Sequence, residues 1–159
     1  MPLPDPMIGL RSFSQVHAQG GLTLRQGDLD PDVYVYLDRP EGQLRFTYAR
    51  LHGGTVIATA ILGQAEPVDG VPCFDVHYAV MPEHRGQGVA TELVRSAISE
   101  LTNGFVRNGV RDLYFEAIVG AENEASQRVA MKTIAAEGEE AIDEEAEVPV
   151  VQFLGRFTN

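Results

Sequence analysis

The residues best suited to chemistry lie where a predicted strand gives way to a predicted helix. Segment 79–91 reads AVMPEHRGQGVAT, and it places Gly86 and Gly88 directly before the helix. Glycines at such a junction let backbone N–H groups turn toward one point, and the positive N-terminal end of the helix reinforces them. This arrangement suits an anion such as phosphate. The sequence therefore predicts a phosphate site built from the main chain.

Two common phosphate-binding motifs do not fit this segment. A Walker loop requires Gly-Lys-Ser/Thr, and segment 79–91 contains no lysine. A dinucleotide fingerprint requires Gly-x-Gly-x-x-Gly/Ala, whereas Thr91 occupies the third position here. That fingerprint also belongs to a parallel βαβ unit, and hairpin-like strands precede this loop. Both interpretations are poor.

Titratable residues on two predicted strands could move protons. Asp75 and His77 share one face of the strand that enters the loop, and Glu116 lies on a later strand. Histidine suits a general base because its unperturbed pKa lies near neutrality. Cys73 is the only cysteine, which excludes an internal disulfide and a thiolate zinc cluster. No metal site is predicted.

The middle and end of the chain have clear patterns. Strands are predicted at 44–48, 55–62, 73–80, 113–119 and 148–157, with a hairpin turn at His52-Gly53-Gly54. Apolar side chains at three-and-four spacing predict a helix from Gln87 to about Asn103, which Gly104 would end. Asn123 would cap a second helix that runs to about Ala136.

The first forty residues are less regular. Prolines at 2, 4 and 6 favour an extended lead-in over residues 1–20, followed by a short strand at 22–24. One short helix or turn fits around 33–37. Strands, helix, strand, helix and strand together predict an α/β (α+β) fold, with helices packed on a mixed sheet. A chain of 159 residues has the length of one compact domain, so a single domain is expected over residues 1–159.

Composition narrows the function further. Twelve basic against 23 acidic residues give a net charge of -11, which argues against a nucleic-acid partner. No apolar run reaches the roughly 20 residues of a membrane span. The N-terminus lacks the features of a secretion signal, so a cytoplasmic protein is expected. Seven of the eleven residues at 137–147 are acidic; this run is either a solvated loop or the border of a cleft that attracts a cation.

Two motifs resemble the GNAT superfamily of N-acetyltransferases. The first is Arg85-x-x-Gly88-x-Ala90 after a strand that ends at Val80, and the second is the Asn-x-x-Ser pattern that begins at Asn123. The resemblance covers about residues 73–136. It implies a mostly antiparallel sheet that is splayed at its centre, helices on both faces, and acetyl-CoA as cofactor. Pyrophosphate and pantetheine would be held by Ala79, Val80, Arg85, Gly86, Gln87, Gly88, Val89, Ala90, Thr91, Asn123 and Ser126.

The resemblance leaves the catalytic residues open. Glu116, His77 and Asp75 are candidate bases, but the polar bases of some relatives fall on the opposite strand phase, unless a bulge intervenes. The family's frequent tyrosine acid is absent, because Val129-Ala130-Met131 occupies its place. Tyr78 and Tyr114 are the nearest tyrosines on predicted strands, and buried strand tyrosines usually belong to the core.

The resemblance implies direct transfer of an acetyl group to a primary amine of a small molecule or peptide. The alternative is a GNAT-like module that binds CoA and has lost turnover. Residues 25–43 are short for two helices, so the acceptor side is expected to be open, with a cationic acceptor if the acidic run borders it. A homodimer could complete that side, with contacts from Val150, Val151, Phe153 and Phe157.

Overall fold

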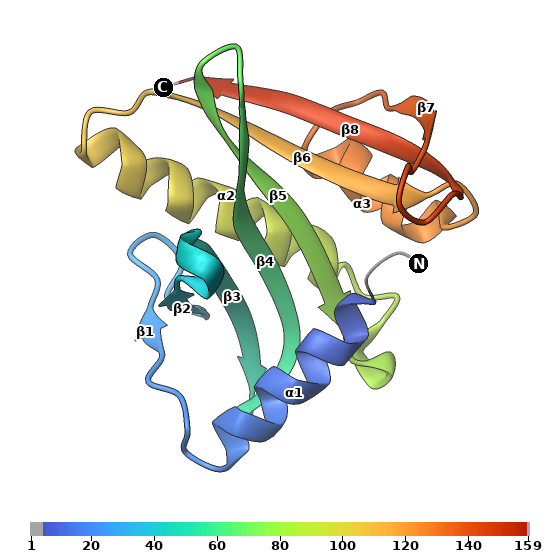
Figure 1. Cartoon of the computed structure of the whole chain (residues 1–159). Helices are drawn as coiled ribbons and strands as arrows, with labels where there is room; N and C mark the ends of the chain where they lie inside the picture. The colour runs from blue at the N-terminus through green and yellow to red at the C-terminus, as the bar shows by residue number, and fades with distance from the viewer. Residues whose placement is uncertain (1–4, 159) are drawn as a thin grey trace.

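The strand patterns of the sequence combine into one twisted sheet in the computed structural model, which describes residues 5–158 (Figure 1). Within those residues the sheet has eight strands in the order β1-β2-β3-β4-β5-β6-β8-β7. All neighbours run antiparallel except β5 and β6, which are parallel. The strands are β1 (Arg25–Gln26), β2 (Val33–Asp38), β3 (Arg45–His52), β4 (Thr55–Val68), β5 (Val71–Val80), β6 (Asp112–Gly120), β7 (Glu139–Ile142) and β8 (Pro149–Thr158).

Helices lie on both faces of this sheet. The face that carries α1 (Pro6–Ala18) is called the front face, and the face that carries α2 (Val89–Arg107) and α3 (Glu124–Thr133) is called the back face (Figure 1). Two 3-10 turns, η1 (Pro40–Gly42) and η2 (Pro82–His84), complete the fold. The predicted mixed, mostly antiparallel architecture with helices on both faces is confirmed.

The main core lies between the sheet and the back helices. On α2, the apolar side chains at the predicted spacing are buried there, against strand residues that alternate between the two faces; they are Leu93, Val94, Ala97, Ile98 and Leu101. A smaller core joins α1 to the front face, where Leu10 packs with Ala49, Val56 and Ala79.

The hairpin of β3 and β4, the strands β5, β6 and β8, and the cap of α3 by Asn123 agree with the sequence predictions. The stop at Gly104 is wrong, because α2 continues to Arg107. A glycine inside a helix costs only about 1 kcal/mol, and Phe105 packs against the main core beyond it. Gly109, at a φ of 85°, turns the chain after the helix.

The prediction of an extended lead-in is wrong for residues 6–18, which form α1; residues 1–4 lie outside the described part. Pro6 occupies the first turn, where its missing N–H costs nothing, and the Asp5 carboxylate accepts a hydrogen bond from the Met7 amide. Met7, Leu10 and Phe13 recur at helical spacing and pack against the front face.

The short helix or turn predicted at 33–37 is also wrong. Val33 and Val35 are buried on the back face as part of β2, and Tyr34 and Tyr36 alternate with them. The strand predicted at 22–24 is absent, and β1 occupies 25–26 instead. The acidic run 137–147 is not wholly a loop, since β7 pairs with β8 within it.

A buried carboxylate fastens the loop between β1 and β2 to α2. Glu100 is only 9% exposed, and its two oxygens accept hydrogen bonds from the amides of Asp28, Leu29 and Asp30 at 2.5–2.8 Å. Gly27 lies so close that a Cβ there would meet the Glu100 carboxylate at 2.9 Å. Glu100 thus provides hydrogen-bond acceptors for three backbone amides that lie outside the strand pairings.

We therefore expect Glu100→Gln to lower the free energy of unfolding by about 1–3 kcal/mol, because the amide group cannot accept all three hydrogen bonds. Urea denaturation measures this change. Glu92→Gln, which removes a charge from the exposed first turn of the same helix, serves as the control and should change stability by less than about 1 kcal/mol. A Glu100→Gln protein as stable as wild type would contradict the tether.

Candidate active site

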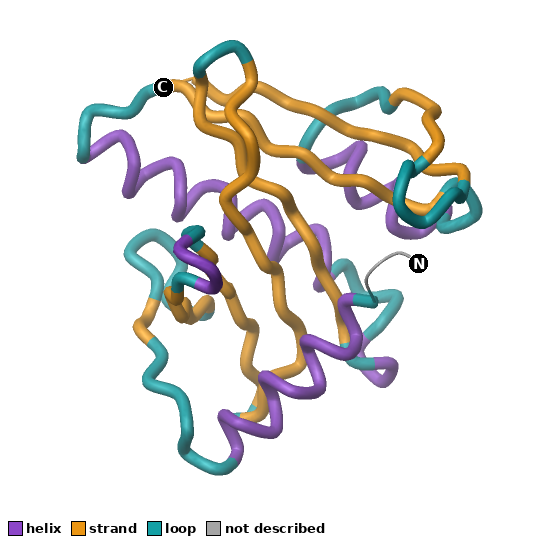
Figure 2. Tube along the Cα trace, in the orientation of Figure 1, coloured by secondary structure: helices purple, strands orange, loops and turns teal. Residues whose placement is uncertain are grey.

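The parallel ladder between β5 and β6 stops early. It joins only Cys73, Phe74 and Asp75 to Tyr114, Phe115 and Glu116. Beyond these pairs the two strands diverge, and each remains paired with its outer neighbour (Figure 2). The facing edges of residues 76–80 and 117–120 thus carry backbone groups with no partner across the gap, as an inserted amide-bearing ligand requires.

The phosphate loop follows at the end of β5. Gly86 and Gly88 have φ values of 74° and 77°, which only glycine adopts readily. Gly88 is the N-cap of α2, and no side chain caps this helix. The first-turn amides of α2 therefore keep their donors free for an anion.

A cavity of about 770 Å³ opens beside this loop, between α2 and α3. It gathers ten of the eleven residues predicted to hold the cofactor, and Gln87 alone is not among its lining residues. The ten are Ala79, Val80, Arg85, Gly86, Gly88, Val89, Ala90, Thr91, Asn123 and Ser126.

Sequence reasoning missed two walls of this cavity. One is the start of α1, which contributes Asp5, Pro6 and Met7. The other is a face of α3 that carries Arg128 and Lys132. These two side chains lie four residues apart, and their spacing on a predicted helix was a signal that could have revealed them.

The Arg85 side chain is directed away from the phosphate position. Its Nε donates to the carbonyl of Val80 at 2.9 Å, and one terminal nitrogen lies 3.2 Å from the sulfur of Met7. Arg85 therefore ties the end of β5 to α1. Its backbone amide donates to the Pro82 carbonyl at 3.3 Å, so the free amides of the loop begin after Arg85.

Ser126 and Tyr78 form a hydrogen-bonded pair inside the cavity. The Tyr78 hydroxyl donates to the Ser126 carbonyl at 2.6 Å and accepts from the Ser126 hydroxyl at 2.7 Å. Burial raises the pKa of Tyr78, so the phenol keeps its proton at neutral pH. The Asn123 carboxamide accepts from the Ser126 amide at 3.1 Å, which is the predicted helix cap.

Asp75 and Glu116 lie side by side on the front face, at the last pair of the parallel ladder. Burial, together with the neighbouring Glu116 carboxylate, raises the pKa of Asp75 to about 6. Gln152 on β8 donates to Glu116 at 2.7 Å. The sequence indicated both acids, but neither their pairing nor the role of Gln152.

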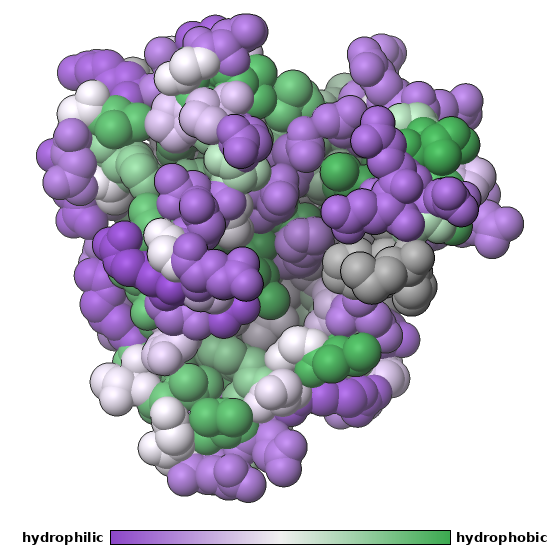
Figure 3. Space-filling model, in the orientation of Figure 1, coloured by the Kyte–Doolittle hydropathy of each residue, from purple (hydrophilic) through white to green (hydrophobic). Residues whose placement is uncertain are grey.

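His77 lies two residues beyond Asp75 on the same front face, opposite Ile61 of β4. Burial lowers its pKa, so the ring is neutral at physiological pH. The pairing of β4 with β5 is regular from Cys73 to Val80, so no bulge there changes the strand phase. Hydrophilic residues occupy the centre of this face, between the η1 segment and the β7–β8 hairpin (Figure 3).

The sequence model of the acetyltransferase (GNAT) family matches residues 16–134, well over half of the chain. The chain belongs to the GNAT acetyltransferase family. The resemblance read from residues 73–136 is thereby confirmed. No curated protein matches this GNAT chain in a sequence search.

Solved structures share the fold at low sequence identity. A GNAT-family acetyltransferase from Streptococcus pneumoniae is 14% identical with a TM-score of 0.54, covering 97% of this chain and 96% of that one. A ribosomal-protein-S5-alanine acetyltransferase from Vibrio fischeri is 13% identical with a TM-score of 0.52, covering 74% and 62%. A ribosomal L7/L12 alpha-N-protein acetyltransferase in complex with coenzyme A is 13% identical with a TM-score of 0.50, covering 69% and 60%. The chain thus spans only about three fifths of the length of the last two proteins.

Within residues 5–158 of this GNAT protein, none of the helices has the length and apolar character needed to cross a membrane.

The loop geometry gives a direct test. Gly88→Val places a β-branched residue at a φ of 77°, which costs roughly 1–2 kcal/mol and displaces the amides beside it. Because a hydrogen bond to a charged group contributes about 1.5–3 kcal/mol, we expect coenzyme A affinity to fall at least about tenfold. Isothermal titration calorimetry measures it.

Gly70→Val is the matched control. Gly70 has the same φ of 77° and equally open surroundings, but it lies in the turn between β4 and β5. It should bring the same backbone strain and leave coenzyme A affinity unchanged. Equal losses in both variants, or none in Gly88→Val, would rule out the loop as the anion site.

Proposed function

We propose that this protein is an acetyl-CoA-dependent N-acetyltransferase that transfers the acetyl group directly to a primary amine of a small molecule or peptide. The observation that carries the proposal is that β5 separates from β6 after Asp75, and that its end, together with the uncapped N-terminus of α2, lines a cavity. Family membership supports acetyl transfer as the chemistry, and the bound group would supply the activated acetyl thioester.

The residues of the cavity suit a diphosphate and an amide-bearing arm. The amides of residues 86–91 would bind the pyrophosphate, while Arg128 and Lys132 add positive charge to an otherwise acidic protein. The free edge of β5 at residues 76–80 would pair with the amides of the pantetheine arm. One N–H of that edge would stabilise the oxyanion that forms during transfer.

Proton removal from the amine is assigned to the front face. The pair of Asp75 and Glu116 lies where the gap begins, and the raised pKa of Asp75, about 6, brings it closer to that of an effective base at neutral pH. Gln152 orients Glu116. His77 is the second candidate, because its lowered pKa keeps the ring neutral and able to accept a proton.

Proton delivery to the departing thiolate is assigned to Tyr78. Its side chain lies on the back face, opposite to that of Asp75 and His77, and lines the cavity. From β5 its hydroxyl reaches Ser126 in the first turn of α3. The hydroxyl therefore lies near the helix that carries the tyrosine acid in other family members, although Val129-Ala130-Met131 occupies that place here.

The acceptor is proposed to be cationic. The 3-10 turn η1 alone connects β2 to β3, so the front face lacks further helices from this region. Within the acidic run, Glu139 of β7 lies opposite Gln152 in the β7–β8 ladder, and the Gln152 side chain donates to Glu116. Acidic groups thus extend from the candidate base toward the β7 edge of the sheet.

The homodimer stays a prediction, but the residues suggested for its interface are wrong. Val150 and Phe153 are 4% and 2% exposed. Val151 and Phe157 pack against the main core of the same chain. These side chains already stabilise the monomer, so an interface would have to use other residues.

Release of free thiol from acetyl-CoA, measured with a panel of primary amines, tests the proposed activity. We expect amine-dependent thiol release by the wild type. General acid catalysis contributes roughly 10²–10⁴-fold, so Tyr78→Phe should lower kcat by about 10²-fold or more, with coenzyme A affinity unchanged.

Tyr114→Phe, on the front face, is the control for Tyr78→Phe and should keep the wild-type rate. Coenzyme A binding without thiol release above background, for every amine, would favour the alternative of a binding module without turnover.

The pH profile tests the base. As pH falls through about 6, Asp75 takes up a proton and the carboxylate pair loses its ability to accept one, so kcat/KM should decline on the acid side. Glu116→Gln removes the like charge that raises the pKa of Asp75. This variant should be slower, and its acid limb should move to lower pH.

The amine substrate also titrates, but it does so in the same way with every variant. Differences between the pH profiles of the variants therefore report on the protein groups alone. His77→Gln should leave the acid limb in place. An acid limb that disappears only in His77→Gln would transfer the role of base from the carboxylate pair to His77.

A further inference from the structure

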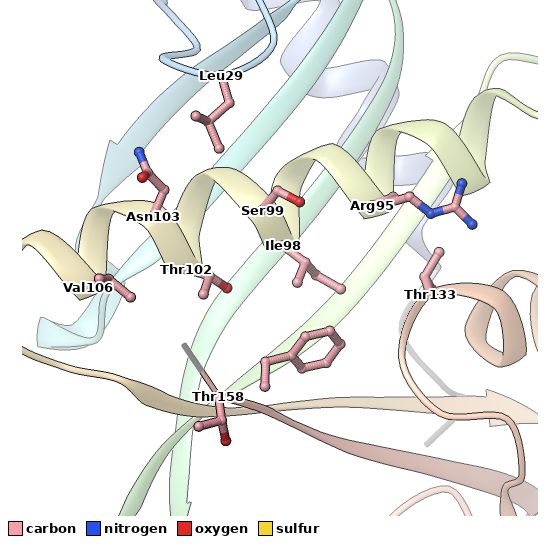
Figure 4. A pocket seen from close by; sticks show the side chains of 10 residues that line it. Leu29, Arg95, Ile98, Ser99, Thr102, Asn103, Val106, Thr133 and Thr158 are labelled. Carbon is pink, nitrogen blue, oxygen red and sulfur yellow. The ribbon is translucent and has the colours of Figure 1, made fainter.

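A second cavity lies on the other side of α2, between its C-terminal half and the end of β8 (Figure 4). Its volume is about 430 Å³, which lies within the roughly 300–1,000 Å³ of small-molecule sites. Figure 4 shows Ile98 and Thr102 directed from α2 toward Thr158 on β8, with Arg95 and Thr133 at the other end. None of the residues proposed to bind acetyl-CoA lines this cavity.

The hydroxyl of Thr102 has no hydrogen-bond partner among the described residues. Thr102 is 9% exposed, and its side chain lines the cavity. A helical threonine usually donates to the carbonyl four residues earlier. Thr133, which lines the same cavity, does so, with its hydroxyl 2.7 Å from the Val129 carbonyl. Thr102 thus lines the cavity with a buried hydroxyl that has no partner among the described residues.

Among residues 5–158, Arg95 is the only charged residue that lines this cavity. One terminal nitrogen donates to the Lys132 carbonyl at a long 3.4 Å, and no ion pair involves its guanidinium within residues 5–158. A single cation without an acidic neighbour in the cavity matches a single negative charge. A dianion would leave one charge without a partner.

Apolar surface separates these two polar groups. Ile98 and Phe157 form it, and Thr102 lies seven residues after Arg95 on the same helix. At 1.5 Å per residue this spacing is roughly 10 Å along the helix axis. The cavity therefore has a cationic end, an apolar middle and a hydrogen-bonding end.

We propose that this cavity binds a small organic monocarboxylate, with its carboxylate on Arg95, its apolar body against Ile98 and Phe157, and a hydroxyl or amide group on Thr102. The site is separate from the proposed acetyl-CoA site and does not depend on the acetyltransferase activity. Its ligand contacts the helix whose N-terminus forms the phosphate loop.

Three probes of similar shape distinguish the contribution of the carboxylate from that of the hydroxyl. 4-Hydroxyphenylacetate carries both groups, phenylacetate lacks the hydroxyl, and 4-hydroxyphenylethanol lacks the carboxylate. Titration of the full ¹⁵N-labelled chain, followed by amide chemical shifts, should show 4-hydroxyphenylacetate binding most tightly. The shifts should centre on Ser99, Thr102 and Thr133.

Two variants then assign each contact. Arg95→Met should lower the affinity for 4-hydroxyphenylacetate roughly tenfold, so that this probe no longer binds more tightly than 4-hydroxyphenylethanol. Thr102→Val should abolish its advantage over phenylacetate. Thr102→Val should not lower the melting temperature, because it removes an unpartnered hydroxyl and keeps the shape of the side chain.

Thr133→Val is the matched control. It removes a hydroxyl from the same cavity, but that hydroxyl already bonds to Val129, so probe affinity should stay at the wild-type value.

Several results would overturn the site. One is the absence of saturable shifts at these residues with 4-hydroxyphenylacetate. Another is equal affinity for all three probes. A third is a change in the amide chemical shift of Thr102 when coenzyme A is added, if Arg95→Met abolishes that change. Such a result would make the cavity the nucleotide end of the acetyl-CoA site. Thiol release by Arg95→Met and Thr102→Val should match wild type, so failure of this site and failure of the proposed activity remain distinguishable.

Discussion

The interrupted hydrogen-bond ladder between β5 and β6 is the constraint on which the site depends. Backbone N–H and C=O groups are costly to bury without partners, so two parallel strands that stop pairing must expose their edges to water or to a ligand. Here the outer pairings with β4 and β8 continue past the last shared pair at Asp75 and Glu116. Those outer ladders hold the two strands apart beyond that pair, where Tyr78, Ala79 and Val80 of β5 line the cavity on the back face.

Charge is distributed to suit this connection. The chain has a net charge of -11, yet the proposed diphosphate position combines uncapped helix amides with Arg128 and Lys132. Backbone dipoles and two local cations would suffice for a diphosphate there, because electrostatic interactions of exposed groups weaken beyond about 8–10 Å at physiological salt. Seven acids of the run 137–147 lie instead in and around β7, at the edge of the sheet where a cationic acceptor is proposed. An acidic protein can thus bind a polyphosphate at one place and attract a cation at another.

Local patterns gave the parts of the fold that could be predicted. The alternation in β3 to β6 and the apolar spacing of α2 are properties of neighbouring residues, so they could be read directly. Helix α1 was missed because its apolar residues Met7, Leu10 and Phe13 acquire a partner only when the front face exists. The proximity of Asp75 to Glu116 depends on a parallel register across some forty residues, and the bond between Tyr78 and Ser126 depends on how α3 packs. No spacing in the sequence encodes either contact.

The alternation of β5 also determines how the proposed chemistry divides between the faces. Asp75 and His77 face the front, whereas Tyr78, one residue later, faces the cavity on the back. A slip of one residue would exchange these faces, so the register of β5 must be fixed securely. It is fixed by its long antiparallel ladder with β4, which runs from Cys73 to Val80 while the ladder with β6 covers only three pairs. Strand β5, which would place both base and acid, therefore takes its register from β4, which does not border the gap. A ligand that enters between β5 and β6 does not compete for the pairing that sets this register.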